Sequence, residues 1–351
     1  MKLFVFVSLL VSLAIGSQYY SVDEYLQKHP HQKALMERFD ALVQSDAVAI
    51  DTEHKKVKIA MLYPGSQISD YWRRSQKSFE ARMQELGIDY EIESIFVDET
   101  DELGLRRSLL KLLKNESDYL IFTLNISGHQ KLISQLIHNQ RQKIILQNIT
   151  TPLKEWEGVQ PFMYVGFDHI EGTKLLAGYF KRHQKEGANY LMLYHTQGYV
   201  SQMRGDSFIE MVQDTHRLKG AYYTDVDKER AKAFVVARED IKSIDYIYSC
   251  STDIAIGVSE ALQALGLHER ISINGWGGGS AELDMIEAGV MDVTVMRMND
   301  DNGVAMAEAI RLDILGKPVP LIYSGHFKLV DKTLDQERIE AYKKRAFRYS
   351  Q

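Results

Sequence analysis

The stretch KIAMLYPGSQISDYW, residues 58–72, guides the interpretation of the whole chain. Its first half, Ile59 to Tyr63, is an apolar run with the length of one buried strand. Pro64 and Gly65 end that run, because proline lacks the N–H that a sheet needs and glycine allows unusual backbone angles. The residues from 70 onward have the pattern of a helix. We therefore predict a strand, a polar turn and a helix in succession.

The predicted turn carries Gln67 and Ser69, and Trp72 follows at the start of the helix. Open α/β sheets bind their ligands at the carboxyl ends of strands, so these side chains are candidates for ligand contact. The alternative is purely structural, with Ser69 capping the helix and Trp72 in the core. The same arrangement recurs at several later strands, and this recurrence favours a binding site.

Length and charge narrow the class of protein. A chain of 351 residues suggests two domains. The hydrophobic fraction of 45% and the charged fraction of 26% are typical of globular proteins with sizeable cores. A net charge of −6 argues against a nucleic-acid partner, because phosphate backbones are bound by basic faces.

The first 16 residues have the features of an export signal. Lys2 supplies a positive charge, Leu3 to Ile15 form an apolar run, and Ala14-Ile15-Gly16 places small residues at a cleavage site. The run is shorter than the roughly 20 residues that span a membrane. We predict an exported, periplasmic protein that begins near Ser17 after cleavage and has no membrane insertion of its own.

The single cysteine, Cys250, cannot form a disulfide within the chain. It ends an apolar run and is interpreted as a small buried packing residue rather than a nucleophile.

Strands and helices alternate from residue 58 onward, after a helical extension at 17–57. This alternation predicts an α/β fold with parallel sheets and helices on both faces. The pattern restarts after a loop with Pro152 and Pro161, so we predict two Rossmann-like lobes. The predicted lobes are 58–166 with 298–322, and 167–297 with 323–351.

Later strand ends repeat the polar pattern of the first one. Asn148 ends the strand at 143–148, Ser251 and Thr252 follow the strand at 246–250, and Trp276 lies among glycines after 271–274. Serine and threonine before a helix are also common caps, so each position alone is weak evidence for a binding site. The glycine run lacks the order of a nucleotide-binding loop. Together, these groups suit a ring with hydroxyl groups, with Trp72 and Trp276 stacking on its faces.

Two arginines follow predicted strands. Arg204 opens a helix, where the helix dipole disfavours a cation, so an anionic partner is expected, either a ligand or the nearby Asp206. Arg297 comes directly after an apolar strand and needs a partner if it is buried. We find no cluster with metal-ligand spacing, and we predict no cofactor. Asp253 and Asp300 are the carboxylates placed to act as acid or base, which leaves an enzyme only as a weak alternative.

The segment STDIAIGVSEALQALG, residues 251–266, resembles the periplasmic sugar-binding proteins of the ribose type. Further strings are similar to the periplasmic autoinducer-2 receptors of vibrios within that fold. They are YPGSQISDYW (63–72), DYLIFTL (118–124), LQNITTP (146–152), YVGFDH (164–169), CSTD (250–253), NGWGGGSAELD (274–284), VMRMNDD (295–301) and KRAFRYS (344–350).

This resemblance implies a type I periplasmic binding protein with a three-crossing hinge near Tyr164–Asp168, Arg297–Asp300 and Leu321–Ser324. It implies a furanosyl borate diester as ligand and the periplasmic domain of a membrane hybrid sensor histidine kinase as partner, in quorum sensing. The implied contacts are Gln67, Ser69, Trp72, Asn148, Arg204, Ser251, Thr252, Trp276 and Arg297.

A sugar-binding protein of an ABC importer is the main alternative, because it would use the same fold. A transcription factor is disfavoured, since no helix-turn-helix precedes the lobes and an export signal does.

Overall fold

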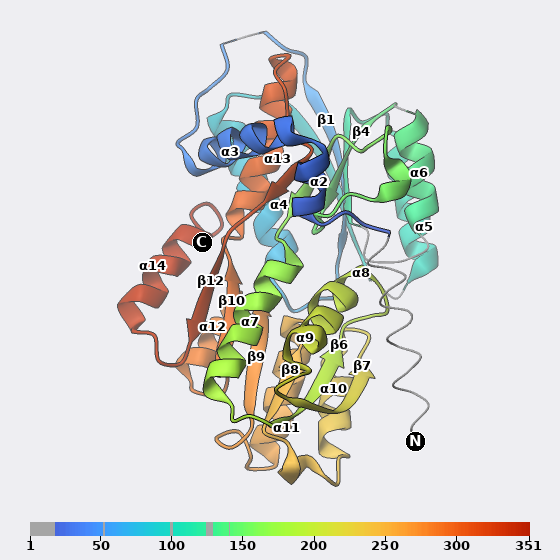
Figure 1. Cartoon of the computed structure of the whole chain (residues 1–351). Helices are drawn as coiled ribbons and strands as arrows, with labels where there is room; N and C mark the ends of the chain where they lie inside the picture. Colours follow the sequence, from blue (N-terminus) through green and yellow to red (C-terminus); the bar gives the residue numbers. More distant parts are fainter. Residues whose placement is uncertain (1–17, 52, 99–100, 124–128, 140) are drawn as a thin grey trace.

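Two six-stranded sheets form the cores of two lobes in the computed structural model (Figure 1). The structure describes residues 18–351 except 52, 99–100, 124–128 and 140, so the predicted export signal lies outside the described residues. The first sheet has the order β11-β5-β4-β3-β1-β2, and all its neighbours are parallel. The second has the order β12-β10-β9-β8-β6-β7, with β12 antiparallel to β10. The predicted fold class is confirmed.

The strands of the first sheet are β1 (Val57–Pro64), β2 (Tyr90–Val97), β3 (Tyr119–Thr123), β4 (Lys143–Gln147), β5 (Met163–Gly166) and β11 (Ile322–Ser324). Those of the second sheet are β6 (Asn189–Tyr194), β7 (Arg217–Tyr223), β8 (Tyr246–Ser249), β9 (Ser272–Gly277), β10 (Val293–Arg297) and β12 (Phe327–Asp331). β1 and β3 are apolar and buried along almost their whole length, as expected for strands covered on both faces.

The helices before the hinge are α2 (Val22–Lys28), α3 (Pro30–Gln44), α4 (Tyr71–Glu85), α5 (Glu102–Lys114), α6 (His129–Asn139) and η1 (Lys154–Trp156). The later ones are α7 (His169–His183), α8 (Tyr199–Ser201), η2 (Gln202–Asp206), α9 (Ser207–Val212), α10 (Lys228–Val236), η3 (Ile241–Ser243), α11 (Thr252–Ala264), α12 (Ser280–Glu287), α13 (Asp300–Ile314) and α14 (Gln336–Ala346).

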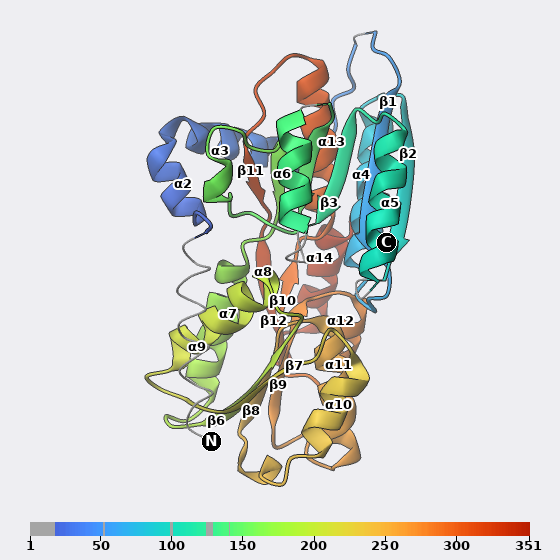
Figure 2. The same cartoon turned by 90° about the vertical axis from the view of Figure 1, so that its right-hand side faces the viewer.

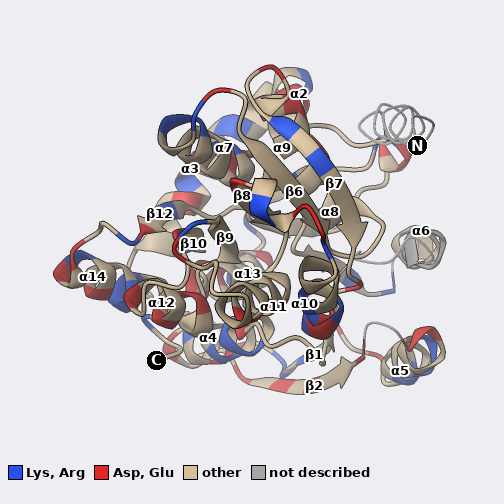
Figure 3. Ribbon diagram, turned by 90° about the horizontal axis from the view of Figure 1, so that it is seen from below, with Lys and Arg blue, Asp and Glu red and all other residues tan. Residues whose placement is uncertain are grey.

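Helices cover both faces of each sheet. In the first lobe, α3, α4 and α13 pack on one face, and α5 and α6 pack on the other. In the second lobe, α7 and α9 lie on one side, and α10, α11 and α12 lie on the other (Figure 2). Acidic and basic residues are interspersed on α5, α10 and α14, so these outer helices form no continuous basic face (Figure 3).

Three crossings join the lobes, and they hydrogen-bond to one another. The first crossing leads from β5 to α7, and the second leads from β10 to α13. The third lies at Gly325 and His326, slightly after the predicted 321–324, because Ile322–Ser324 still pair with β5. The Gly325 N–H donates to the Gly166 carbonyl at 2.8 Å, and the Met298 N–H donates to the His326 carbonyl at 2.9 Å. All three crossings are thereby held side by side.

The helical extension packs on the first lobe. Phe39 and Val43 of α3 enter the core on the α13 side, and Tyr20 and Tyr25 enter the core on the opposite face of the sheet. Tyr19 also reaches the second lobe, where its ring lies 4.9 Å from that of Tyr199.

The C-terminal tail, residues 347–351, returns from the second lobe to the first. This differs from the predicted assignment of 323–351 to the second lobe. The buried Asp300 carboxylate accepts hydrogen bonds from the Tyr349 and Ser350 N–H groups and from the Ser350 hydroxyl. Arg74 donates to the Ser350 carbonyl at 2.7 Å and stacks on Phe347. The tail is thus a further connection between the lobes.

Within the described part of the chain, no helix combines the length and the apolarity that a membrane crossing requires.

Candidate functional site

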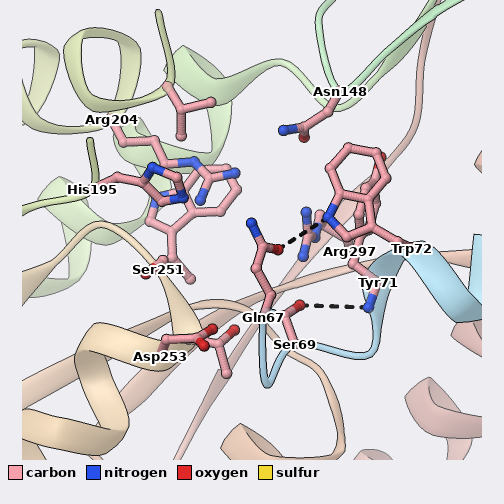
Figure 4. Close-up of a pocket in the computed structure, with 13 residues that line it drawn as sticks. Gln67, Ser69, Tyr71, Trp72, Asn148, His195, Arg204, Ser251, Asp253 and Arg297 are labelled. Atoms are coloured by element: carbon pink, nitrogen blue, oxygen red, sulfur yellow. Dashed lines mark hydrogen bonds between the residues drawn. The ribbon is translucent and has the colours of Figure 1, made fainter. Parts of the chain in front are cut away.

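A pocket lies between the lobes, at the carboxyl ends of strands from both sheets (Figure 4). It encloses about 390 Å³ of empty space, part of it open to solvent. All nine residues predicted as ligand contacts line it, although they come from turns far apart in the sequence. The lining residues are Gln67, Ser69, Tyr71, Trp72, Asn148, His195, Val200, Arg204, Ser251, Thr252, Asp253, Trp276 and Arg297.

The turn after β1 supplies the first wall of the pocket. The Trp72 indole N–H donates to the Gln67 side-chain oxygen at 3.0 Å, which fixes both side chains (Figure 4). Ser69 does not occupy the N-cap position of α4, since that residue is Asp70, but its hydroxyl accepts the Tyr71 N–H at 3.4 Å. The purely structural alternative for Ser69 and Trp72 is therefore incomplete, because both side chains also line the pocket.

Asn148 enters the pocket from the end of β4. Its backbone is left-handed, with φ of 65°, a conformation that asparagine tolerates better than most residues. The side-chain oxygen is buried without a hydrogen-bond partner among the described residues. Buried polar atoms are almost always paired, so this oxygen indicates a donor on the ligand.

The second lobe presents hydroxyl groups at the start of α11. Ser251 is the N-cap residue, yet its hydroxyl makes no capping bond and is buried without a partner in the described part of the chain. Thr252 follows as the first helical residue and is almost fully buried. The Ser251 and Thr252 hydroxyls are therefore better placed to bind a ligand than to cap α11.

Arg204 does not open a helix, contrary to the sequence prediction. It lies in η2, a π-helical segment between α8 and α9. The expected ion pair with Asp206 is not formed among the salt bridges of the described residues, and the Asp206 carboxylate accepts the Tyr194 hydroxyl at 2.6 Å. The Arg204 guanidinium donates to the Cys250 carbonyl at 2.8 Å and to His169 Nδ1 at 3.4 Å. Cys250 itself is buried, as predicted.

Trp276 belongs to β9, not to a loop as predicted. The Arg204 guanidinium lies 3.6 Å from the centre of its ring, so one face of the indole holds an arginine. This face therefore cannot stack on a ligand ring, and ligand stacking by Trp276 stays a prediction. Trp276 also positions Arg204 through a cation–π contact.

Arg297 reaches the pocket from the end of β10. Its guanidinium stacks over Tyr71, with 4.1 Å to the ring centre. Gly277, with φ of 142°, makes room for it, because a Cβ there would lie 2.6 Å from a guanidinium nitrogen. Arg297 is only 6% exposed, and no hydrogen bond or salt bridge from it to any other described residue is formed.

The two arginines make the pocket a site for an anion. Burial, and then the charge of Arg297, lower the pKa of Arg204 to about 9. Burial lowers the pKa of Arg297 as well. Neither arginine forms a salt bridge within the described ranges. Glu282 favours the charge of both from a distance, but its carboxylate is already bound by the Trp276 and Gly278 N–H groups.

Four lining residues were not predicted as ligand contacts: Tyr71, His195, Val200 and Asp253. His195 directly follows β6, so its position at a strand end was a usable signal. Burial lowers the pKa of His195 to about 3, which keeps it neutral. Asp253 accepts the Ile68 N–H, and Asp300 lies under the C-terminal tail, away from the pocket.

Two α/β lobes joined by three crossings, with a polar pocket between them, define a two-lobed ligand-binding protein. The chain belongs to the periplasmic binding protein domain family, whose model matches residues 59–318. This is a family of solute-binding proteins.

Individual relatives share only a modest sequence identity with this chain. The D-allose-binding periplasmic protein of Escherichia coli (strain K12) is 31% identical over 112 residues, which cover 31% of this chain and 36% of that relative. The solute-binding protein of an Actinobacillus succinogenes 130z ABC transporter, solved with D-allose, has a TM-score of 0.68 at 19% identity. That comparison covers 82% of this chain and 100% of the other. A solved XylFII–LytSN complex has a TM-score of 0.67 at 15% identity. This comparison covers 80% of this chain and 99% of the other.

Proposed function

We propose that this chain is a periplasmic receptor for a small anionic sugar derivative, the furanosyl borate diester known as autoinducer-2. The observation that carries the proposal is Arg297, a buried guanidinium that faces the pocket without an acceptor among the described residues. An uncompensated buried charge is costly, so it is retained where a ligand supplies the opposite charge. Arg204 in the same pocket strengthens this argument.

The surrounding groups suit the rest of such a ligand. Ser251 and Asn148 have side-chain oxygens with no partner among the residues that the structure describes, and these suit the hydroxyls and ring substituents of a furanose. Tetrahedral borate esters keep one negative charge, and arginines keep their own charge over the whole physiological range. The string similarity to autoinducer-2 receptors of the LuxP type supports the same ligand. We assign the protein no reaction, since its part is to bind and to close.

Signalling requires a partner, and we propose the periplasmic domain of a membrane hybrid sensor histidine kinase. The resemblance to autoinducer-2 receptors supports this partner. A solved structure of the same fold is a XylFII–LytSN complex, so chains of this fold are known in complexes. Export by cleavage near Ser17 belongs to the same proposal and is tested by N-terminal sequencing of the secreted protein. A secreted chain that retains Met1 contradicts it.

The second candidate is a sugar-binding protein of an ABC importer. Its support is that the D-allose-binding relative and the ABC transporter protein are both named for solute binding. Neutral sugars, however, offer hydroxyl acceptors but no negative charge to two buried arginines.

Calorimetry with dihydroxypentanedione, the ligand precursor, separates the two candidates. Titrations are run in borate-depleted and borate-supplemented buffer, with D-allose and D-ribose as neutral comparison ligands. We expect tight binding of the precursor with borate and weak binding without it. Equal affinity in both buffers contradicts the borate ligand. Tight binding of a neutral sugar favours the importer.

A further inference from the structure

His169 lies behind the pocket, where the first crossing enters the second lobe. It is the first residue of α7, directly after the crossing residues 167 and 168, and it is 1% exposed. It does not line the pocket, and although it ends the string YVGFDH, it is not among the predicted ligand contacts. Its ring nevertheless contacts groups from both lobes, and these contacts determine its protonation state.

Each ring nitrogen of His169 has one partner. Nδ1 lies 3.4 Å from Arg204 Nε, and Nε2 lies 3.2 Å from the Asn148 carbonyl oxygen. A guanidinium only donates hydrogen bonds, so Nδ1 must be the unprotonated nitrogen. The carbonyl only accepts, so Nε2 must carry the proton. One neutral tautomer satisfies both partners, and no other does.

The neighbours of the ring keep it neutral and fixed. Burial, and then the charges of Arg204 and Arg297, lower the pKa of His169 well below its ordinary value. The Trp276 ring stands nearly perpendicular to it, with centroids 5.3 Å apart, and the Tyr199 ring lies 5.7 Å away. The imidazole therefore has little freedom to rotate.

We propose that His169 is a positioning residue of the ligand site, which holds Arg204 of one lobe and the Asn148 peptide of the other in register. The inference rests on the proposed function, because the groups it orients are the proposed ligand contacts. Arg204 is already bound on one side by Cys250 and Trp276, so His169 fixes the remaining rotation of its guanidinium. Asn148 needs a similar anchor, since its left-handed backbone is intrinsically less favourable.

The position of His169 at a crossing explains how one residue serves both lobes. Points near a hinge axis move little when two lobes rotate, so the bond to Asn148 persists as the lobes open and close. A contact farther out along α7 would break with each opening. His169 therefore keeps Arg204 oriented before a ligand arrives, which lowers the entropy lost on binding.

Two substitutions test the proposal. His169→Leu removes both hydrogen bonds, whereas His169→Gln keeps an acceptor for Arg204 and a donor for Asn148. Titration with dihydroxypentanedione in borate buffer should show an affinity loss of about 10- to 100-fold for the leucine variant. The glutamine variant should recover most of this loss. His216→Leu is the matched control, because His216 is a buried histidine of the second lobe that bonds Tyr246 outside the pocket.

A second measurement does not depend on the identity of the ligand. Nitrogen-15 NMR of the histidine rings should show a proton on Nε2 of His169 and none on Nδ1. The Arg204 Nε–H signal should shift and broaden in His169→Leu but remain in His169→Gln and His216→Leu. If the unsubstituted protein does not bind the borate probe, the proposed function fails, and this measurement still decides the role of His169.

Two outcomes would overturn the inference. One is an unchanged Arg204 Nε–H signal in His169→Leu. The other is an affinity loss in His216→Leu as large as that in His169→Leu, since both variants would then act through general loss of stability.

Discussion

The Asp253 carboxylate of the second lobe accepts the backbone N–H of Ile68 in the first lobe at 2.8 Å. This bond joins the two rims of the pocket directly, without a ligand between them. Burial raises the pKa of Asp253, so its charged form is disfavoured in the closed arrangement. The hydrogen bond and the desolvation of the charge therefore act in opposite directions on closure.

Replacing Asp253 separates these two effects. Asp253→Asn keeps an acceptor for Ile68 and removes the buried charge, so it should close at least as readily and bind the anionic ligand at least as tightly. Asp253→Ala leaves the N–H without a partner and should disfavour closure by about 1–3 kcal/mol. Small-angle scattering without ligand measures the compaction. A more open Asp253→Asn variant would contradict this account.

Arg297 should stabilise the complex and destabilise the empty protein. Arg297→Met should raise the ligand-free free energy of unfolding by about 1 kcal/mol, because it removes an unpaired buried charge. The same change should cost roughly 2–5 kcal/mol of binding, or about 30-fold to several-thousand-fold in affinity. Urea denaturation and calorimetry measure the two effects.

Arg82→Met is the matched control for that pair of measurements. Arg82 is also buried, but it forms a salt bridge with the buried Glu308 at 2.6 Å. Its loss should destabilise the protein by about 3–5 kcal/mol, since Glu308 loses its main buried partner. If both variants shift stability in the same direction, the contrast between a paired and an unpaired arginine is refuted.

The buried neutral histidines predict a loss of stability in mild acid. His195 has a pKa of about 3, lowered by burial and then by Arg204. Because its pKa is lower in the folded than in the unfolded protein, the unfolded state takes up the proton first as pH falls below about 6.5. His195 alone should cost about 2 kcal/mol of stability at about pH 5. Denaturant unfolding at about pH 5 and above about pH 6.5 measures this loss of stability. The His195→Asn variant, which lacks the histidine, is the comparison.

The C-terminal tail should contribute more to stability than its short length suggests. Deleting residues 348–351 leaves the buried Asp300 carboxylate without three donors and should cost roughly 3 kcal/mol or more. Deleting Gln351 alone should have little effect, because its described contact is an exposed bond from Lys77. Thermal unfolding of the two truncations compares them. Similar melting temperatures would show that the tail is dispensable.

The sequence predicted the fold well because buried parallel strands produce uninterrupted apolar runs, as in β1 and β3. It also identified residues that line one pocket, because strand ends converge in such folds. It missed the role of Trp276 and the partners of Arg204, which depend on packing between distant segments. The π-helical turn around Arg204 has no periodic signature in the sequence, so its displacement from a helix start was not predictable. His169 ends the string YVGFDH, but that string does not reveal its role, which follows from the contacts it makes across the hinge.

The position of α13 has a consequence for how the chain is made. α13 packs against α3 and α4, and Gly303 lies so close to Ser78 that an added Cβ would be 2.1 Å from the hydroxyl oxygen. The lobe that begins at residue 57 therefore lacks a helix of its core until residue 314 has been synthesised. During that interval the apolar side chains of α4, such as Phe79 and Met83, lack the part of their cover that α13 supplies. Contacts between segments this far apart in sequence also form slowly. The newborn first half of the chain is thus the part that most needs protection from aggregation.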